Sequence, residues 1–265
     1  MKASPATREK AAPQGLAMTG SGPPLVFVPG MDGTGLLFYR QIPLLKSEYR
    51  VATYRLREEA PDMAVLVEDL ATVVRAVGGG TRATIVGESF GGTLAMSFAL
   101  AHPELVDRLV ILNSFPRFLP QFRLRLAITG IRLLPWGAMS MVRRATAFRL
   151  HSRHTHRREM ERFLKLTAQT TKRGYVSRLR ILRHLDVRQR LHEIEAPTLL
   201  LASELDHLVP SVAEARYMAE RIPDATVRIL HGHGHICLIA PQVDLAQILR
   251  EWREADKRLP PWRFA

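Results

Sequence analysis

The feature that most constrains the fold of this chain is a short β-branched run that leads straight into a glycine-flanked serine. Residues 83–92 read ATIVGESFGG, and an apolar segment of small residues follows them. This order predicts a strand, a sharp turn at Ser89 and then a helix. Glycines two positions before and after the serine let the strand and the helix approach each other closely. Because Gly-x-Ser-x-Gly is common by chance, the prediction depends on its strand-like and helix-like flanks.

Further apolar runs alternate with helical patterns on both sides of this turn. Besides the run at 83–86 that leads into this turn, the predicted strands span residues 24–28, 50–56, 109–112, 197–202 and 226–230. Helical patterns span residues 61–77, 91–101, 212–221 and 243–254. Strands that alternate with helices through short loops form parallel sheets with helices on both faces. We therefore predict an α/β fold with a mostly parallel, doubly wound sheet.

The alternation stops after Ser114, and residues 115–195 show only helical, arginine-rich patterns. This segment holds 19 Lys and Arg against 5 Asp and Glu, whereas the rest of the chain holds 19 against 20. The net charge of +13 is therefore a property of this segment. An insertion at this point would lie over the carboxyl ends of the strands, where α/β sheets bind ligands. We predict a polar lead at 1–23, a core at 24–114 and 196–256, a helical cap at 115–195 and an irregular tail at 257–265.

The composition and the start of the chain exclude several classes of protein. Apolar residues make up 46% of the chain, which supports a packed core and argues against disorder. The single cysteine, Cys237, excludes a disulfide framework, and no Cys/His spacing resembles a zinc site. Residues 1–21 lack the apolar centre of a signal peptide, and no apolar run is long enough to span a bilayer. We expect a cytoplasmic protein.

Two later loops carry the residues that a reactive serine needs. Serine is a poor nucleophile at neutral pH, so a histidine must take its proton and a carboxylate must orient that histidine. Asp206 follows the predicted strand at 197–202, and His235 follows the predicted strand at 226–230. The predicted acid and base thus each lie on a loop that directly follows a strand, as the predicted serine turn does.

Both loops leave alternatives open. Glu204 is a rival acid, and a helix N-cap role would explain Asp206 without catalysis. His231, His233 and His235 alternate, and the apolar run after the last of them favours His235 as the base. A metal site built from the three histidines is a minor alternative, because the glycines between them indicate a turn.

Taken together, these motifs resemble the α/β-hydrolase fold family in its capped, lipase- and esterase-like form. The resemblance covers residues 24–114 and 196–254 and includes a Gly-x-Gly-His segment at the base. The order Ser, Asp, His is also that of the family, and the proline four positions after Asp206 matches the family's acid segment, which favours Asp206 over Glu204. At position 203 this chain has serine where members of the family often have glycine. The loop PGMDGTG at 29–35 is also similar to a loop of plastid esterase/diacylglycerol acyltransferase-like proteins, which points to acyl-lipid chemistry.

The resemblance implies a role for each residue of the site. Ser89 would be the nucleophile, Asp206 the acid and His235 the base. The backbone N–H groups of Phe90 and Met31 would form the oxyanion hole, with Asp32 bracing the loop through hydrogen bonds to its backbone.

We therefore predict a serine hydrolase that cleaves carboxylic esters, with no cofactor and no metal. An acyltransferase with the same three residues is one alternative, and a non-catalytic binding protein on the same fold is another. The apolar and arginine-rich cap could form a lid over an acyl pocket, bind an anionic substrate or contact an anionic membrane peripherally. Alternatively, its helices pack on the core and turn a charged face to solvent. The chain has no motif that supports nucleic-acid binding.

Overall fold

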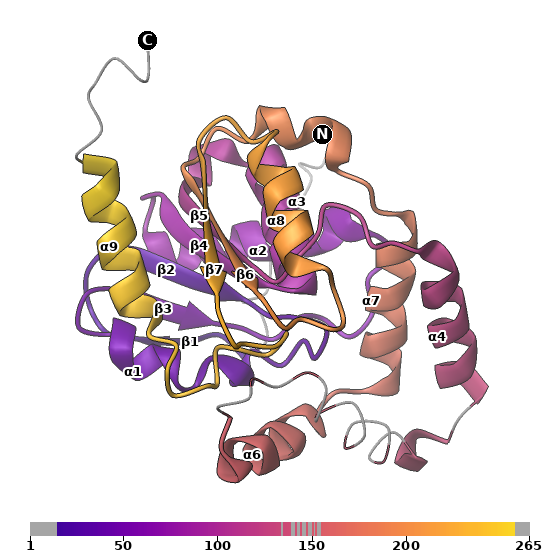
Figure 1. Ribbon diagram of the computed structural model, residues 1–265. Coiled ribbons are helices and arrows are strands. Elements are labelled where there is room, and N and C mark those ends of the chain that lie inside the picture. Colours follow the sequence, from indigo (N-terminus) through magenta and orange to yellow (C-terminus); the bar gives the residue numbers. More distant parts are fainter. Residues whose placement is uncertain are drawn as a thin grey trace, which may run out of the picture.

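Seven strands form one sheet in the order β1-β3-β2-β4-β5-β6-β7 (Figure 1). The computed structural model describes residues 15–133, 135–138 and 155–257, with the single residues 141, 144, 147, 150 and 152 between them. The strands are β1 Ala17–Thr19, β2 Pro24–Val28, β3 Arg50–Thr53, β4 Ala83–Glu88, β5 Val106–Leu112, β6 Thr198–Ser203 and β7 Ala225–Leu230. All neighbouring pairs are parallel except β1 and β3. The predicted α/β fold with a mostly parallel sheet is therefore confirmed.

The edge strand β1 was not expected, because residues 1–23 are predicted as a polar lead. Its three residues are exposed and show no apolar alternation, so the sequence carries no strand signal there. Antiparallel pairing with β3, in which Met18 lies opposite Ala52, is what makes this segment a strand. Residues 1–14 of the lead, and residues 258–265 of the predicted tail, lie outside the described part of the chain.

Alternate side chains of each central strand pack into two separate cores. In β2, Val26 and Val28 belong to one apolar cluster, whereas Leu25 and Phe27 belong to the other. The first cluster includes residues of α2 Met63–Gly78, α3 Phe90–Ala101 and α8 Ser211–Ala219. The second includes residues of α1 Gln41–Leu45 and α9 Leu245–Lys257. Burial on both faces explains why these strands read as continuous apolar runs.

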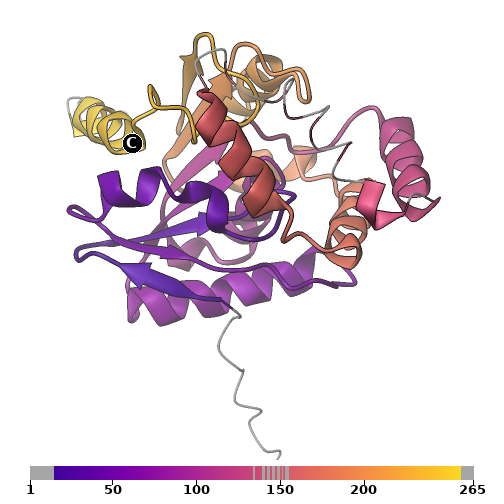
Figure 2. The same ribbon diagram turned by 90° about the horizontal axis from the view of Figure 1, so that it is seen from below.

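The inserted segment, residues 115–195, leaves the core after β5 and returns to it before β6. Its helices are α4 Gln121–Leu133, α6 Arg157–Thr167 and α7 Lys172–His184, with 3-10 turns η3 Trp136–Ala138 and η4 Arg188–Glu193. The described residues of this segment include no strand. Figures 1 and 2 show α4 and α7 side by side, with α4 on the outside of the molecule. Helix α6 lies next to η1 Leu36–Phe38, in the segment that follows β2.

Hydrogen bonds join the inserted segment to loops at the carboxyl ends of the strands. Arg178 of α7 donates to the backbone carbonyl of Met31, after β2, and Ile236, after β7, donates its N–H to the carbonyl of Leu150. The insertion therefore contacts the same edge of the sheet at which β4 ends. In the part of the chain that the structure describes, no helix has the length and apolar character needed to cross a bilayer.

Candidate active site

The turn at Ser89 joins the central strand β4 to helix α3 in the way the sequence predicts. Ser89 has φ 55° and ψ −119°, a conformation that L-residues rarely adopt. A Cβ atom on Gly87 would lie 2.3 Å from the carbonyl oxygen of Gly91, and one on Gly91 would lie 2.1 Å from that of Val28. One on Gly92 would lie 2.5 Å from the Cβ of Ser114. The glycines are required because the backbone around Gly87 and Gly91, and the side chain of Ser114 beside Gly92, fill the space around the turn.

Gly91→Ala is expected to destabilise the protein by about 3 kcal/mol or more, because the new methyl group would overlap the backbone of β2. The matched control is Gly130→Ala, since Gly130 lies in α4 and a Cβ there would meet no atom within 4 Å. That control should leave stability unchanged or raise it by about 0.5–1 kcal/mol. Urea unfolding followed by circular dichroism measures both. Equal stability of the two variants would contradict the packing account.

The structure brings Ser89, His235 and Asp206 together from three different loops. The Oγ of Ser89 lies 3.0 Å from Nε2 of His235, and Nδ1 of His235 lies 2.7 Å from Oδ2 of Asp206. The two side chains are almost completely buried, with 6% of His235 and none of Asp206 exposed. Hydroxyl, imidazole and carboxylate thus form one continuous chain of hydrogen bonds.

Several donors hold the carboxylate of Asp206 in its ionised form. Burial by itself would raise its pKa, but hydrogen bonds from His235, Ser211 and the backbone N–H of Val209 outweigh burial, and the pKa lies below the ordinary value. The rival acid Glu204 accepts a hydrogen bond from the N–H of Gly232 and thereby holds the histidine loop. The geometry therefore favours Asp206 over Glu204 as the partner of the histidine.

The side chains of the three alternating histidines lie in three different environments. His231 is exposed and its Nδ1 lies 3.4 Å from Oε2 of Glu204. Nδ1 of His233 lies 2.8 Å from Oγ of Ser152, in the inserted segment. His235 is the one that contacts Ser89. Within the described residues, no group of three or more His, Cys, Asp and Glu side chains is arranged to hold a metal ion.

The loop after β2 lies beside the serine and is braced from within. A Cβ on its Gly30 would lie 3.3 Å from the carbonyl oxygen of Glu88 and 3.9 Å from the Cβ of Ser89. Asp32 accepts hydrogen bonds from the N–H and the hydroxyl of Thr34, as the sequence predicts, and the N–H of Gly33 donates to the carbonyl of Gly30. The predicted oxyanion donors sit on this loop, at Met31, and at the first residue of α3, Phe90, where a helix has no internal acceptor for the N–H.

Arg178 of the inserted segment also holds this loop, which sequence reasoning missed. Its Nε donates to the carbonyl of Met31 at 2.9 Å, and its Nη2 donates to the carbonyl of Asp32 at 3.2 Å. Thr170 donates to the same carbonyl of Asp32. Arg178 is 3% exposed, and this burial lowers the pKa of its guanidinium to about 10. Gly33 is necessary here, because a Cβ on it would lie 2.6 Å from the guanidinium.

Asn113, at the end of β5, is a second buried polar residue that the sequence analysis missed. Its Nδ2 donates to the carbonyl of His235 at 2.7 Å and to the hydroxyl of Ser203 at 2.9 Å. Its Oδ1 accepts from the N–H of Ser203 at 2.8 Å. Asn113 therefore connects the strand before the acid to the backbone of the histidine. The available signal was a polar residue directly after the apolar run at 109–112.

Glu88 lies directly before the serine and is buried beneath the site. Burial is the main reason that its pKa is raised to about 7, while His235 nearby acts in the opposite direction. Its Oε1 has no hydrogen-bond partner among the described residues. This carboxyl group is therefore neutral over much of the acidic range, unlike Asp206.

The stability of the protein is expected to fall as the pH rises from about 4.5 to about 7, in part because of Glu88. In this range the folded protein keeps a proton that the unfolded chain has lost, so each pH unit costs about 1.4 kcal/mol, to a total of about 3 kcal/mol. Glu88→Gln should remove this pH dependence of the unfolding free energy. The stability of the variant relative to the wild type should therefore increase as the pH rises. Urea unfolding over this range measures the difference, and parallel curves for the two proteins would contradict it.

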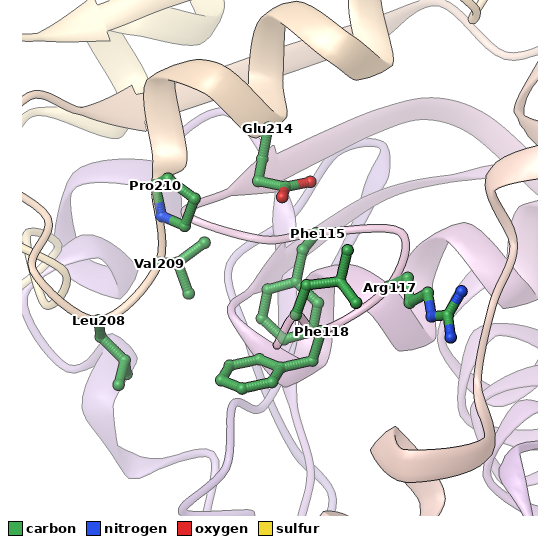
Figure 3. Close-up of a pocket in the computed structure, with 8 residues that line it drawn as sticks. Phe115, Arg117, Phe118, Leu208, Val209, Pro210 and Glu214 are labelled. Carbon is green, nitrogen blue, oxygen red and sulfur yellow. The ribbon is translucent and has the colours of Figure 1, made fainter. Parts of the chain in front are cut away.

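A shallow hollow opens beside the loop that carries Asp206 (Figure 3). Phe115 and Phe118, from the start of the inserted segment, lie across it from Leu208 and Val209. Arg117, Leu119, Pro210 and Glu214 complete its lining. The inserted segment thus supplies an apolar wall next to the acid loop.

Comparisons with known proteins agree with this architecture. The model of the alpha/beta hydrolase fold family matches residues 23–240. "Putative carbamate hydrolase RutD" of Serratia proteamaculans is 28% identical over 90% of this chain and 95% of its own length. The protein of the same name from Yersinia enterocolitica is 30% identical over 80% of each chain. An esterase from Thermogutta terrifontis superposes with a TM-score of 0.79 at 22% identity, over 91% of this chain and 92% of its own.

The match of the family model spans most of the chain and includes β2, the turn at Ser89, β6, β7 and the histidine loop. The sheet order and the position of the serine turn at the end of the central strand agree with that match. The chain belongs to the α/β hydrolase fold family and is a hydrolase of the α/β type.

Proposed function

We propose that this protein is a serine hydrolase that cleaves carboxylic esters through Ser89, His235 and Asp206 by way of an acyl-enzyme. The observation that carries the proposal is the chain of hydrogen bonds in which Nε2 of His235 lies 3.0 Å from the serine Oγ and its Nδ1 lies 2.7 Å from Asp206. These contacts are within the range in which a nucleophile and its base exchange a proton.

The geometry supports a sequence of proton and acyl transfers. His235 takes the proton of Ser89 as Oγ attacks the ester carbonyl, and Asp206 stabilises the imidazolium that forms. The N–H groups of Phe90 and Met31 stabilise the negative charge on the carbonyl oxygen. The imidazolium then gives the proton to the leaving alcohol, and an activated water releases the acyl group from the serine. No cofactor takes part in these steps.

Carbamates are a second candidate substrate class, because the curated relatives described above are named as carbamate hydrolases. A carbamate carbonyl reacts with an activated serine through the same tetrahedral intermediate. Its nitrogen donates electrons into the carbonyl and slows the attack, so a site built for carbamates has to stabilise the oxyanion more strongly than one built for esters.

A fluorophosphonate probe tests the proposal, because it labels serines that a histidine activates. Labelling of the wild type, and none of Ser89→Ala, is the expected result. Steady-state rates on matched aryl esters and aryl carbamates with increasing acyl chain length then identify the substrate class. If the folded wild type takes up no label, a non-catalytic binding protein explains the site better.

An acyl-transfer activity would use the same acyl-enzyme with an alcohol in place of water. Adding a series of alcohols during ester turnover distinguishes the two reactions. An acyltransferase should form the new ester faster than the free acid, whereas a hydrolase should form mostly the free acid at low alcohol concentration.

Placement of the enzyme in the cytoplasm stays a prediction from the sequence.

A further inference from the structure

Helix α4 has apolar side chains on two opposite faces, and only one of these faces is buried. Leu124, Ile128 and Ile131 are 2%, 8% and 8% exposed and belong to the core cluster that includes α7. Phe122, Leu126 and Leu133 are 59%, 68% and 80% exposed. Spacings of four and seven residues put these last three on one side of the helix. An exposed stripe of large apolar residues on a helix is a feature of interaction surfaces.

The charged residues that accompany this stripe along the chain are of one sign. Residues 115–158 contain ten arginines and no Lys, Asp or Glu. On α4 itself, Arg125 and Arg132 are exposed, and neither forms an ion pair with any residue that the structure describes. The helix therefore presents an apolar stripe with unpaired positive charge beside it. A partner that fits must offer an apolar interior below a negatively charged surface.

We propose that the outer face of α4, formed by Phe122, Leu126 and Leu133 with Arg125 and Arg132 beside them, docks on the surface of an anionic lipid bilayer. The three apolar side chains enter the boundary between headgroups and acyl chains, and the arginines contact lipid phosphates. An acidic protein would satisfy the arginines but would leave the stripe in contact with water unless it also had an apolar groove. A lipid surface satisfies both features at once.

The position of α4 in the molecule agrees with this orientation. Figures 1 and 2 show α4 as the outermost element on its side, with α7 between it and the sheet. Leu119, which is 48% exposed, precedes α4 and also lines the hollow together with Leu208. The apolar surface therefore extends from α4 toward the loop of Asp206, although the docking itself does not depend on the proposed reaction.

Flotation of the full-length protein with vesicles tests this proposal. The probes are vesicles of phosphatidylcholine and phosphatidylglycerol in equal parts, and vesicles of phosphatidylcholine alone. We expect the wild type to float with the first and not with the second. Binding should fall by at least about a hundredfold in Phe122→Ser/Leu126→Ser/Leu133→Ser, since each apolar side chain contributes about five- to tenfold. It should also fall in Arg125→Gln/Arg132→Gln and at about 1 M salt, where charges are screened beyond about 3 Å.

The matched control replaces exposed apolar residues elsewhere, in Met18→Ser/Leu44→Ser, which are 54% and 41% exposed in the wild type. This control should float as the wild type does, and all variants should unfold at similar temperatures because the changed side chains are exposed. Failure of the wild type to float, or equal flotation of the α4 variant, would overturn the proposal. So would a lipid-free dimer that the α4 variant loses in analytical ultracentrifugation, because the stripe would then be a self-association surface.

Discussion

Asp206→Asn is expected to lower kcat/KM for an ester substrate by about four orders of magnitude without unfolding the protein. The carboxylate accepts the hydrogen bond of His235 at 2.7 Å and compensates the positive charge that develops on the imidazole. An amide has the same shape but no charge, and it can present an N–H to Nδ1, which stabilises the wrong tautomer. In that tautomer Nε2 carries the proton and cannot accept one from Ser89.

Glu204→Gln is the matched control, because Glu204 is the acid that the sequence leaves as an alternative. Its carboxylate accepts from the N–H of Gly232 and lies 3.4 Å from the exposed His231, so its loss should change the rate by no more than a few-fold. Stopped assays on both variants, with circular dichroism to verify folding, give the comparison. A large loss in Glu204→Gln beside a small loss in Asp206→Asn would reverse the assignment of the acid.

Arg178→Met is expected to lower kcat by about a hundredfold, a loss similar to that of removing one oxyanion donor. The guanidinium holds the carbonyls of Met31 and Asp32, on the loop that carries the proposed donor at Met31. Without it the loop loses its fixed orientation, and the N–H no longer points to the developing negative charge. KM should change less, because a ground-state carbonyl depends less on that N–H than the oxyanion does.

The same change is expected to reduce stability by about 1–3 kcal/mol, since two buried carbonyl groups lose a donor. Arg180→Met is the control, because Arg180 lies two residues further along α7 and is exposed. The decisive readout is the affinity for a boronic acid inhibitor, which resembles the tetrahedral intermediate. If Arg178→Met weakens ester binding and boronate binding equally, then Arg178 acts on the general fold of the loop and not on the oxyanion hole.

Asp206→Asn tests the hydrogen-bonded group of Ser89, His235 and Asp206, and Arg178→Met tests the proposed oxyanion hole. The chain assembles these two parts of the site in different ways. Ser89, Asp206 and His235 all come from loops of the core. The loop at Met31 also belongs to the core, but it is held by Arg178 and Thr170 of the inserted segment. The insertion therefore contributes to the site, since it supplies contacts that hold this loop. Any movement of α7 would change the position of that loop.

Much of the fold could be predicted from the sequence, because the decisive signals are local. The strand at Pro24–Val28 was predicted with its correct bounds, and β4, β6 and β7 within a residue or two at either end. Strands β2, β4 and β6 are buried along their whole length, so they read as continuous apolar runs. Strand β7, at the edge of the sheet, is only partly buried. The glycines two positions before and after Ser89 are also a local signal, and they indicated the tight turn. Strand β1 was missed because pairing with β3, and not its own composition, stabilises it.

The sequence by itself determined the fold class, the place of the serine turn and the order of acid and base along the chain. The sequence favoured Asp206 over Glu204 and His235 over its two neighbours, but only the tertiary structure places these two side chains in contact with each other and with Ser89, because directions of side chains on glycine-containing loops depend on what packs against those loops. It alone brought Arg178 to Met31 and Asn113 to His235, in contacts between residues more than a hundred positions apart. It also decided which apolar face of α4 is buried, since helical spacing defines both faces and only packing against α7 chooses between them.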